Sequence, residues 1–350
     1  MRTAFLWILT AGMAWTQLQA QEERFGPCTR SVDWKDISVV KEHPASPNAG
    51  ILMITNRPYR PDNPDGILFP NEIADFRRVT YMAATCSEDH WTLNLVEGFD
   101  EGMAAVDHGE DILFFVHGHG KSLPSVLTRA SRIREKYGVT VVVFDWPSMN
   151  MNFNTSLTNV RRCGENFYNL LLQFGEYRRH HMKNRQSLTL MLHSLGNYFL
   201  THLVVNGNNQ YLDSKIFDNI IMNSAAVRSR EHGKVISQIR FSHRLYVVVN
   251  ENDRVLRGAQ LLTTGRMLGN GMMKPLAKNA VYVDFTCVAG IEHTYFTGYN
   301  DFEYTQPAIG YFFDEAIHGR KVDFKDRNLF VPGAAQNIWV VRDPSSGCPE

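Results

Sequence analysis

Short and almost continuous runs of apolar residues recur along the chain. The run at residues 139–144 (VTVVVF) is rich in β-branched side chains and shows no alternation of apolar and polar positions. This pattern predicts a strand that is covered on both faces, as in a parallel sheet. Runs of the same kind lie at residues 51–55, 79–84, 91–96, 112–116, 188–192, 220–222, 245–249 and 281–285.

Longer segments with helical spacing separate most of these runs. They lie at residues 125–137, 159–178 and 195–205, the last directly after the run at 188–192. Strands that alternate with helices predict a doubly wound, mostly parallel α/β sheet with helices on both faces. No helical segment separates the first runs, so we expect an antiparallel N-terminal edge, with the proline-rich stretch 56–71 as a long loop.

The N-terminus has the pattern of a targeting segment. Arg2 precedes an apolar run at residues 4–15, and a stretch resembling a small-residue cleavage site ends at Ala20. The run is shorter than the roughly 20 residues that a membrane-spanning helix needs. We therefore predict a signal peptide at residues 1–20 and export to the periplasm or beyond, with no integral membrane span after cleavage.

The rest of the chain divides into three parts. We assign residues 21–48 to an N-terminal extension, 49–330 to one α/β domain and 331–350 to a C-terminal tail. α/β folds of this size often form a single unit. The apolar triplet 339–341 in the tail could add a last strand to the sheet or only pack on the body of the domain.

Composition argues against two classes of partner. The chain has 36 basic and 36 acidic residues, whereas nucleic acids and anionic membranes attract proteins with a strong basic excess. A hydrophobic fraction of 44% is enough for a sizeable core. We expect a small-molecule partner, and the sequence predicts no particular oligomeric state.

The five cysteines would meet an oxidising compartment after export, where disulfides form. Because their number is odd, at least one should stay free or pair between chains. Cys28 and Cys348 lie near the two mature termini, which are often close together in single domains, so we expect a bridge between them.

The run at 188–192 leads into a His-Ser-Leu-Gly turn that contains Ser194. A serine on a sharp strand-to-helix turn projects clear of the sheet, and the N–H of the next residue points into the same space. The usual motif has glycine two positions before and two after the serine. Here the second position is Gly196, but the first is Leu192. A serine that begins a helix is often only an N-cap, so this string does not decide by itself.

A glycine-rich turn, His-Gly-His-Gly, follows the run at 112–116. In sheets that carry a serine nucleophile, the loop after an earlier strand donates a backbone N–H to the oxyanion that develops in acyl transfer. Glycines let this backbone approach the substrate closely. We assign the oxyanion donors as the N–H groups of His119 and Leu195, with an ordinary glycine-rich turn as the alternative.

Two other functions of this turn fit the sequence less well. The segment 120–122 resembles the end of a phosphate-binding loop with Asp145 as a magnesium ligand, but the first glycine of that motif would fall on Phe115. His117 and His119 have the spacing of a metal pair, but no third ligand follows at the usual spacing. We therefore expect neither a metal nor an organic cofactor.

Two titratable residues stand just beyond later strand ends. Asp253 follows the run at 245–249, and His293 follows the run at 281–285. Histidine can take and return a proton near neutral pH, and a carboxylate can hold it in the required tautomer. Glu251 is the alternative acid. An aspartate at this position could also serve only as a helix cap.

Ser194, Asp253 and His293 follow one another in the order that α/β-hydrolases use for nucleophile, acid and base. At these residues the chain resembles a family of bacterial α/β-hydrolases of unknown function that are regarded as serine esterases. In that family the position before His-Ser is also not glycine. The resemblance implies the triad roles just given, and it leaves the substrate open. The matching segments are 54–57, 115–118, 143–148, 193–197, 252–254 and 293–296.

The sequence therefore predicts an α/β-hydrolase fold and a serine hydrolase, most simply a carboxylic ester hydrolase, that forms an acyl-enzyme. His119 departs from the aromatic or aliphatic residue often found in the family, a change that a backbone donor tolerates. The alternative is a non-catalytic binding protein on the same scaffold. Residues 149–163 could form a lid or an acyl-binding wall, or a loop packed on the body. Their apolar members are Met149, Met151, Phe153 and Leu157.

Overall fold

The computed structural model describes residues 28–41, 50–74, 78–149, 152–182, 185–213, 215–262, 265–297 and 306–342. The predicted signal peptide at residues 1–20 and Cys348 lie outside these ranges, as does part of the predicted N-terminal extension. The division of the chain into an extension, a domain and a tail stays a prediction.

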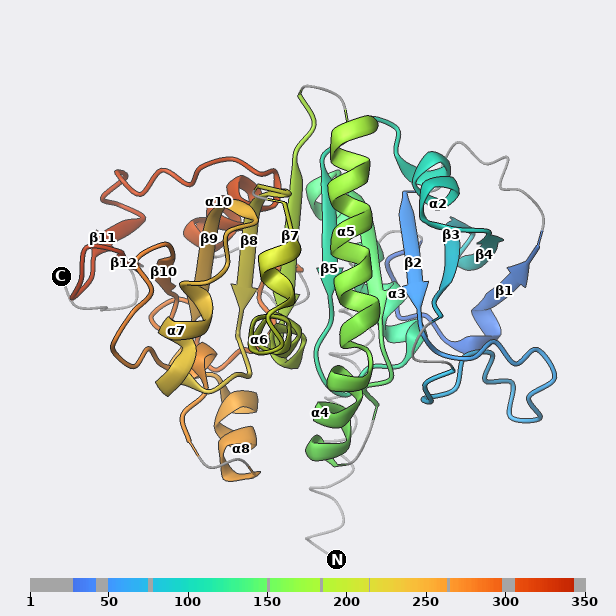
Figure 1. Cartoon of the computed structure of the whole chain (residues 1–350), viewed down its shortest axis with the longest axis horizontal. Coiled ribbons are helices and arrows are strands. Elements are labelled where there is room, and N and C mark those ends of the chain that lie inside the picture. The colour runs from blue at the N-terminus through green and yellow to red at the C-terminus, as the bar shows by residue number, and fades with distance from the viewer. Residues whose placement is uncertain are drawn as a thin grey trace, which may run out of the picture.

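One twisted sheet of twelve strands runs through the described part of the protein (Figure 1). From β2 to β10 neighbouring strands pair in parallel, whereas β2, β3 and β4 pair antiparallel at the N-terminal edge. The spatial order is β1-β4-β3-β2-β6-β5-β7-β8-β9-β10-β12-β11. The strands are β1 (Ile37–Val40), β2 (Ile51–Thr55), β3 (Thr80–Ser87), β4 (His90–Val96), β5 (Ile112–Val116), β6 (Thr140–Asp145), β7 (Leu188–His193), β8 (Phe217–Asn223), β9 (Ser242–Val249), β10 (Val281–Asp284), β11 (Phe330–Pro332) and β12 (Ile338–Val341).

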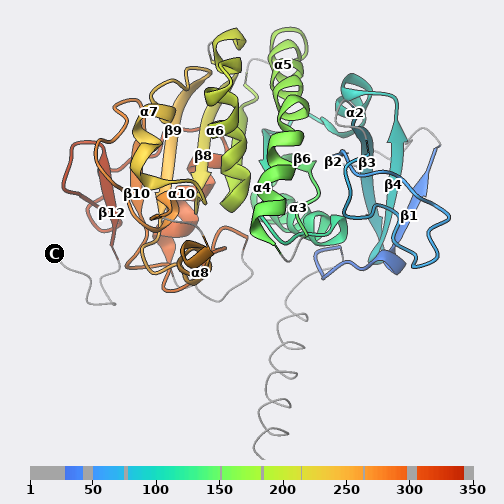
Figure 2. The ribbon, with the colours of Figure 1, turned by 60° about the horizontal axis from the view of Figure 1, so that its bottom comes forward.

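Helices cover both faces of this sheet. Figures 1 and 2 show α2, α5, α6 and α7 on one face and α3 and α10 on the other, with α4 at the end of α5. The α-helices are α2 (Phe99–Val106), α3 (Leu123–Tyr137), α4 (Phe153–Arg162), α5 (Gly164–His180), α6 (Tyr198–Val205), α7 (His232–Ile236), α8 (Arg254–Leu262) and α10 (Pro307–Ile317). Short 3₁₀ turns lie at η1 (Trp34–Asp36), η2 (Ser194–Asn197), η3 (Asn208–Tyr211), η4 (Ser229–Glu231) and η5 (Leu268–Asn270).

The central strands have continuous apolar runs because both of their faces are buried. Along β5, the side chains of Ile112, Phe114 and Val116 pack into the core beneath α5. Leu113 and Phe115 pack into the other core, beneath α3 and α10. The predicted fold class is thus confirmed: a mostly parallel α/β sheet with an antiparallel N-terminal edge.

Two local predictions need refinement. The helical pattern at 159–178 belongs to two helices, because the backbone of Cys163 leaves the helical region between α4 and α5. A Cβ on Gly164 would lie 2.4 Å from the His202 ring, so the glycine lets α5 begin against α6. The triplet 339–341 lies in β12, which pairs parallel to β10. Of the two alternatives for this triplet, the added strand is the observed one.

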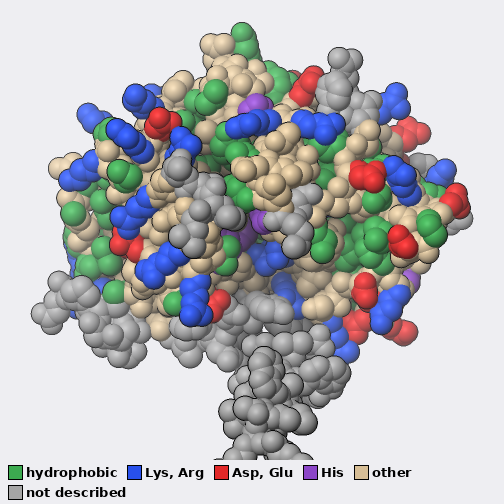
Figure 3. Space-filling view, turned by 90° about the horizontal axis from the view of Figure 1, so that it is seen from below, with side chains coloured by type: hydrophobic (Ala, Val, Ile, Leu, Met, Phe, Trp, Pro, Cys, Tyr) green, Lys and Arg blue, Asp and Glu red, His purple; other side chains and the backbone are tan. Residues whose placement is uncertain are grey.

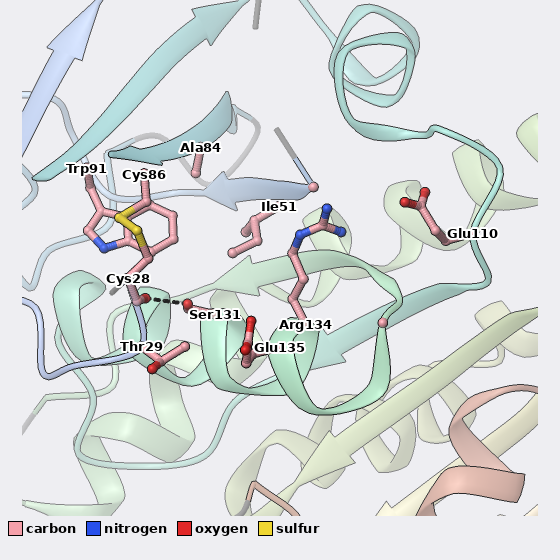
Figure 4. A pocket seen from close by; sticks show the side chains of 12 residues that line it. Cys28, Thr29, Ile51, Ala84, Cys86, Trp91, Glu110, Ser131, Arg134 and Glu135 are labelled. Atoms are coloured by element: carbon pink, nitrogen blue, oxygen red, sulfur yellow. Dashed lines mark hydrogen bonds between the residues drawn. A yellow bond between two sulfur atoms is a disulfide. The ribbon is translucent and has the colours of Figure 1, made fainter. Parts of the chain in front are cut away.

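The expected bridge between Cys28 and Cys348 is wrong, because Cys28 bonds to Cys86 of β3. The physical reason is that Cys28 lies at the N-terminal edge of the sheet, whereas β11 and β12 form the opposite edge. Figure 4 shows this disulfide beside Trp91, with Ser131 of α3 hydrogen-bonded to the Cys28 carbonyl. It borders a cavity of about 370 Å³ at the amino end of β2. Cys287 is also disulfide-bonded, and among the described cysteines Cys163 is free and buried.

Candidate active site

The carboxyl ends of the parallel strands meet at one end of the sheet. Figure 3 looks onto this end and shows histidine side chains in a central hollow, next to basic side chains. Ser194 directly follows β7 and begins η2. Its φ of 54° lies in the left-handed region, which residues other than glycine seldom adopt. This backbone conformation gives the sharp strand-to-helix turn that a projecting serine needs.

Two glycines allow the turn after β5 to lie against the turn that carries Ser194. A Cβ on Gly118 would lie 2.6 Å from the Ser194 Cβ, and a Cβ on Gly196 would lie 2.6 Å from the His117 carbonyl oxygen. Leu192 instead lies inside β7 with its side chain buried in the core. The close backbone approach therefore requires Gly196, and the position of Leu192 has room for a large side chain.

Asp253 and His293 form a direct hydrogen bond. His293 Nδ1 donates to Asp253 Oδ2 over 2.6 Å, and Asp253 is fully buried. The other carboxylate oxygen accepts the Leu256 N–H at 2.9 Å, so Asp253 also caps α8. Glu251, the alternative acid, forms an ion pair with Arg266 instead.

The loop that carries His293 is tied to neighbouring strand ends. Asn250, at the end of β9, donates its side-chain amide to the carbonyls of Gly290 and Glu292 at 3.1 and 2.9 Å. Ser224, just after β8, donates its hydroxyl to the His293 carbonyl at 3.1 Å. The Ala226 N–H donates to the Ser194 carbonyl at 3.1 Å. The segment after β8 therefore contacts both the serine turn and the histidine loop.

His193, which precedes Ser194, lies against His293 with 4.7 Å between the ring centroids. Asn223 donates to His193 Nδ1 at 3.0 Å, which leaves Nε2 to donate to Thr294 Oγ1 at 3.3 Å. Burial lowers the pKa of His193 well below its usual value. His193 therefore stays neutral and contacts His293 by its ring.

Basic side chains add positive charge to this region. Arg129 donates to Thr294 Oγ1 at 3.2 Å and lies over the Phe296 ring. Burial and the charge of Arg129 lower the pKa of Lys121 to about 8. Both cations also lower the pKa of His193. The charges of Arg129 and Lys121 thus favour the neutral form of the His193 imidazole.

His117 is a second neutral histidine. Its Nδ1 donates to the Gly118 carbonyl at 2.8 Å, and its Nε2 accepts the Trp146 N–H at 3.1 Å. The Trp146 ring stacks on it, and burial lowers the pKa of the imidazole. These contacts fix the start of the glycine-rich turn after β5.

A buried ion pair also holds the glycine-rich turn after β5 in place. Arg57 Nε donates to Asp145 Oδ2 at 2.7 Å, and Arg57 Nη2 donates to the carbonyls of Lys121 and Trp146 at 3.0 and 2.9 Å. Burial opposes ionisation of Asp145, but the charge and hydrogen bonds of Arg57 and His117 together outweigh it and lower the pKa of Asp145 to about 2. Asp145 is therefore held in this ion pair. In a phosphate-binding loop it would instead have to be a magnesium ligand.

The rest of the glycine-rich turn is bound to the segment after β6. His119 Nδ1 donates to Ser156 Oγ at 2.9 Å, and its ring lies 5.7 Å from the Phe153 ring. The N–H groups of Gly120 and Lys121 bond to the carbonyl and hydroxyl of Ser148. The His119 N–H lies between these engaged groups and Gly118, which packs against Ser194.

A groove of about 580 Å³ lies between α4, α6 and α7, on the face of the sheet that α5 covers. We call it the α4–α6 groove. Phe153 and Leu157 line it, whereas Met149 is exposed and Met151 lies outside the described residues. The segment 149–163 thus contributes a groove wall through α4.

The sequence singled out Ser194, Asp253 and His293 as candidates because each follows an apolar run, and their catalytic roles stay a prediction. It gave no separate role to Arg57, His193 or Asn223, whose contacts join segments far apart in the chain. A usable signal existed for Asn223, since it is a polar residue directly after the run at 220–222, at the end of the sheet where ligands gather.

The described residues contain no group of three or more His, Cys, Asp or Glu side chains that could hold a metal ion. Over the same residues, no helix is both long enough and apolar enough to cross a membrane.

A sequence model of a family described as α/β-hydrolases of unknown function matches residues 100–292, more than half of the chain. Ser194 and Asp253 lie inside this match, and His293 is the first residue after it. No curated protein matches the sequence.

Similar solved structures include esterases. A monoclinic form of an esterase from Pyrobaculum calidifontis has 13% identity and a TM-score of 0.37, covering 62% of this chain and 80% of its own. A hyperthermophilic esterase from the same archaeon gives the same values. An arylesterase has 12% identity and a TM-score of 0.29, covering 50% of this chain and 68% of its own. These TM-scores are low, and no conclusion about this protein rests on this similarity.

Proposed function

The chain belongs to the family of α/β-hydrolases of unknown function that matches residues 100–292, and on this premise we propose that it is a serine hydrolase of carboxylic esters. The observation that carries the proposal is the 2.6 Å bond from His293 Nδ1 to the buried Asp253. The segment after β8 ties the His293 loop to the turn in which Ser194 is held at a φ of 54°. A histidine that donates from Nδ1 presents Nε2 as an acceptor, which is the tautomer a general base requires.

The proposed reaction has two halves. Ser194 Oγ attacks the ester carbonyl while His293 Nε2 takes its proton, and the same nitrogen then protonates the leaving alcohol. Water next attacks the acyl-enzyme with His293 again as base, which releases the acid and restores the serine. Asp253 stabilises the imidazolium that forms in each half.

In this proposal, backbone N–H groups stabilise the oxyanion. The Leu195 N–H follows the nucleophile, and the His119 N–H lies in the turn that Gly118 brings against Ser194. Such donors are worth about 10²–10³-fold in rate each. The contacts of His117, Arg57 and Ser148 support this assignment, because they hold the turn in one position before substrate binds.

The test compares wild type with Ser194→Ala on p-nitrophenyl acetate and butyrate. We expect Ser194→Ala to lose at least about 10⁴-fold in kcat/KM, because the nucleophile is absent. Ser237→Ala is the matched control, since its hydroxyl bonds only locally to the Lys234 carbonyl of α7. A folded wild type without turnover would favour a non-catalytic binding protein, and an active Ser194→Ala would place the nucleophile elsewhere.

We also propose that the protein is exported, with cleavage after Ala20. The Cys28–Cys86 disulfide supports this, because disulfides persist in oxidising compartments. Expression of the full chain in a bacterial host, followed by mass spectrometry of the periplasmic and cytoplasmic fractions, tests it. The expected product is a periplasmic form that begins at Gln21. Only uncleaved cytoplasmic protein would contradict export.

A further inference from the structure

The α4–α6 groove begins beside the catalytic residues. Its floor includes Ala226, whose N–H donates to the Ser194 carbonyl at 3.1 Å. Its wall includes Phe153, whose ring lies 5.7 Å from the ring of His119. One end of the groove therefore adjoins the backbone of the serine turn and the side chain of His119 in the proposed oxyanion turn.

From this end the groove runs along two helices that both start at the catalytic face. On α6, which follows the serine turn, the lining residues Tyr198, Thr201 and Val205 occupy one stripe at helical spacing. On α4, Phe153 and Leu157 lie one turn apart on the facing side. The stripe on α6 spans about 10 Å, which matches an extended chain of about eight carbons.

The groove is apolar where it is deep and polar where it opens. Met222, Ala226 and Val227 on its floor are at most 5% exposed. Val205, at the far end of α6, is 72% exposed. The charged lining residues Arg161, Arg228 and Glu231 are exposed as well, and Arg161 contacts the hydroxyl of Tyr198 at the start of α6. An uncharged chain along the floor would contact buried apolar side chains and would end near water at Val205.

We propose that the α4–α6 groove binds the acyl chain of the substrate, so that the enzyme prefers esters of medium-length aliphatic acids over acetates. This inference rests on the proposed serine hydrolase function. It adds the substrate class, because a chain placed in the groove leaves the ester carbonyl at Ser194 and the alcohol on the open side. Each methylene buried in an apolar site contributes about 0.8 kcal/mol, or about fourfold in kcat/KM.

The experiment compares p-nitrophenyl acetate and octanoate in wild type, Leu157→Trp and Thr201→Trp. An indole at either position fills the middle of the groove, so the octanoate-to-acetate ratio of kcat/KM should fall at least about tenfold. Leu157→Ala should instead raise the ratio for dodecanoate over octanoate. Leu172→Trp is the matched control: Leu172 is 37% exposed on α5 and does not line the groove, so both kcat/KM values should stay at wild type.

The outcomes separate this inference from the proposed function. If wild type hydrolyses acetate but its ratio is unchanged in both tryptophan variants, the groove is not the acyl site although the enzyme is an esterase. If folded wild type hydrolyses no ester at all, the proposed function fails and this inference fails with it. Thermal unfolding of each variant identifies any that do not fold, and the inference then rests on the remaining groove variants.

Discussion

Three histidines near Ser194 differ in their surroundings, and these differences assign their chemistry. His117 and His193 are buried, and burial lowers the pKa of each. His117 Nε2 accepts the Trp146 N–H and lies 3.2 Å from Asp145, whose carboxylate is already paired with Arg57. His293 instead donates to the carboxylate of Asp253. A neighbouring carboxylate stabilises the imidazolium that forms when a histidine takes a proton. On this basis we propose His293 as the base and His193 as a positioning residue that packs against it.

Asp253→Asn tests this assignment with little change in shape. An asparagine oxygen can still accept the Leu256 N–H and cap α8, but the amide cannot stabilise an imidazolium or hold Nδ1 as the donor. We expect kcat to fall about 10⁴-fold with an unfolding midpoint close to wild type. The measurement is steady-state kinetics on p-nitrophenyl butyrate alongside thermal unfolding. Wild-type kcat in a folded Asp253→Asn protein would show that the Asp253–His293 bond is only structural.

At this scale the sequence could predict residues that follow an apolar run, but not residues defined by a distant partner. Ser194 directly follows β7 and Asp253 stands shortly after β9, so their positions at the end of the sheet follow from the pattern. Arg57 lies in a proline-rich loop and acquires its role only when β2 pairs with β6, which brings Asp145 beside it. No local pattern specifies that pairing.

Among the secondary-structure elements, contacts between loop ends hold the sheet and helices in register. His318, at the end of α10, bonds through Nδ1 to Asp111 at 2.7 Å, and Asp111 directly precedes β5. Ser187, just before β7, donates its N–H to the other oxygen of Asp111. This contact lies at the amino ends of the strands, opposite the candidate active site.

The His318–Asp111 pair predicts a pH-dependent stability. The bond from Asp111 raises the pKa of His318, so its stabilising effect is complete below the usual histidine pKa and is lost as pH rises. Burial opposes ionisation of Asp111, but bonds from His318 and Ser187 outweigh it and lower its pKa, so its effect is lost only in acid. The pair should therefore stabilise most between about pH 4 and pH 6.5.

His318→Asn should lower the free energy of unfolding by up to about 1 kcal/mol near pH 5.5, and by less near pH 8.5. The expected change in the free energy of unfolding is small because the side chains of His318 and Asp111 are both partly exposed. Urea unfolding of wild type and variant at the two pH values measures it, and Asp111→Asn should reproduce the trend. If His318→Asn lowered the free energy of unfolding more at pH 8.5 than at pH 5.5, the result would contradict the pH dependence expected of the His318–Asp111 pair.

Elements with a strong local pattern could be predicted from the sequence, and those shaped by tertiary contacts could not. The strands around β6 have unbroken apolar runs because both faces are covered. The break at Cys163 depends instead on the close packing of Gly164 against His202, which the helical pattern of 159–178 does not encode. β12 depends on pairing with β10, which is more than fifty residues earlier in the chain.

Across the whole molecule, the two edges of the sheet are secured in different ways. The N-terminal edge carries the Cys28–Cys86 disulfide, which closes a segment with a sequence separation of 58. The C-terminal edge is extended by β12 and β11 from the tail. The sequence predicted that at least one cysteine stays free or pairs between chains. Its proximity argument for the termini failed because the described terminal segments lie at opposite edges.

Removal of this disulfide should destabilise the protein without altering its catalytic residues. Cys28→Ser/Cys86→Ser should lower the free energy of unfolding by about 2–4 kcal/mol, because the unfolded chain regains the freedom that the cross-link removes. Urea unfolding measures the change, and kcat on p-nitrophenyl butyrate at low temperature should stay within about twofold of wild type. An unchanged unfolding midpoint would show that the disulfide does not restrict the unfolded chain.

The most direct test of the account asks whether Ser194 is an activated nucleophile. Purified wild type is treated with a fluorophosphonate probe, and the adduct is located by peptide mass spectrometry. We predict one adduct on Ser194, no adduct in Ser194→Ala, and slower labelling in Asp253→Asn, because fluorophosphonates react with serines that a neighbouring base activates. A folded wild type that takes up no probe, or an adduct that maps to another residue such as Ser224, would contradict the account.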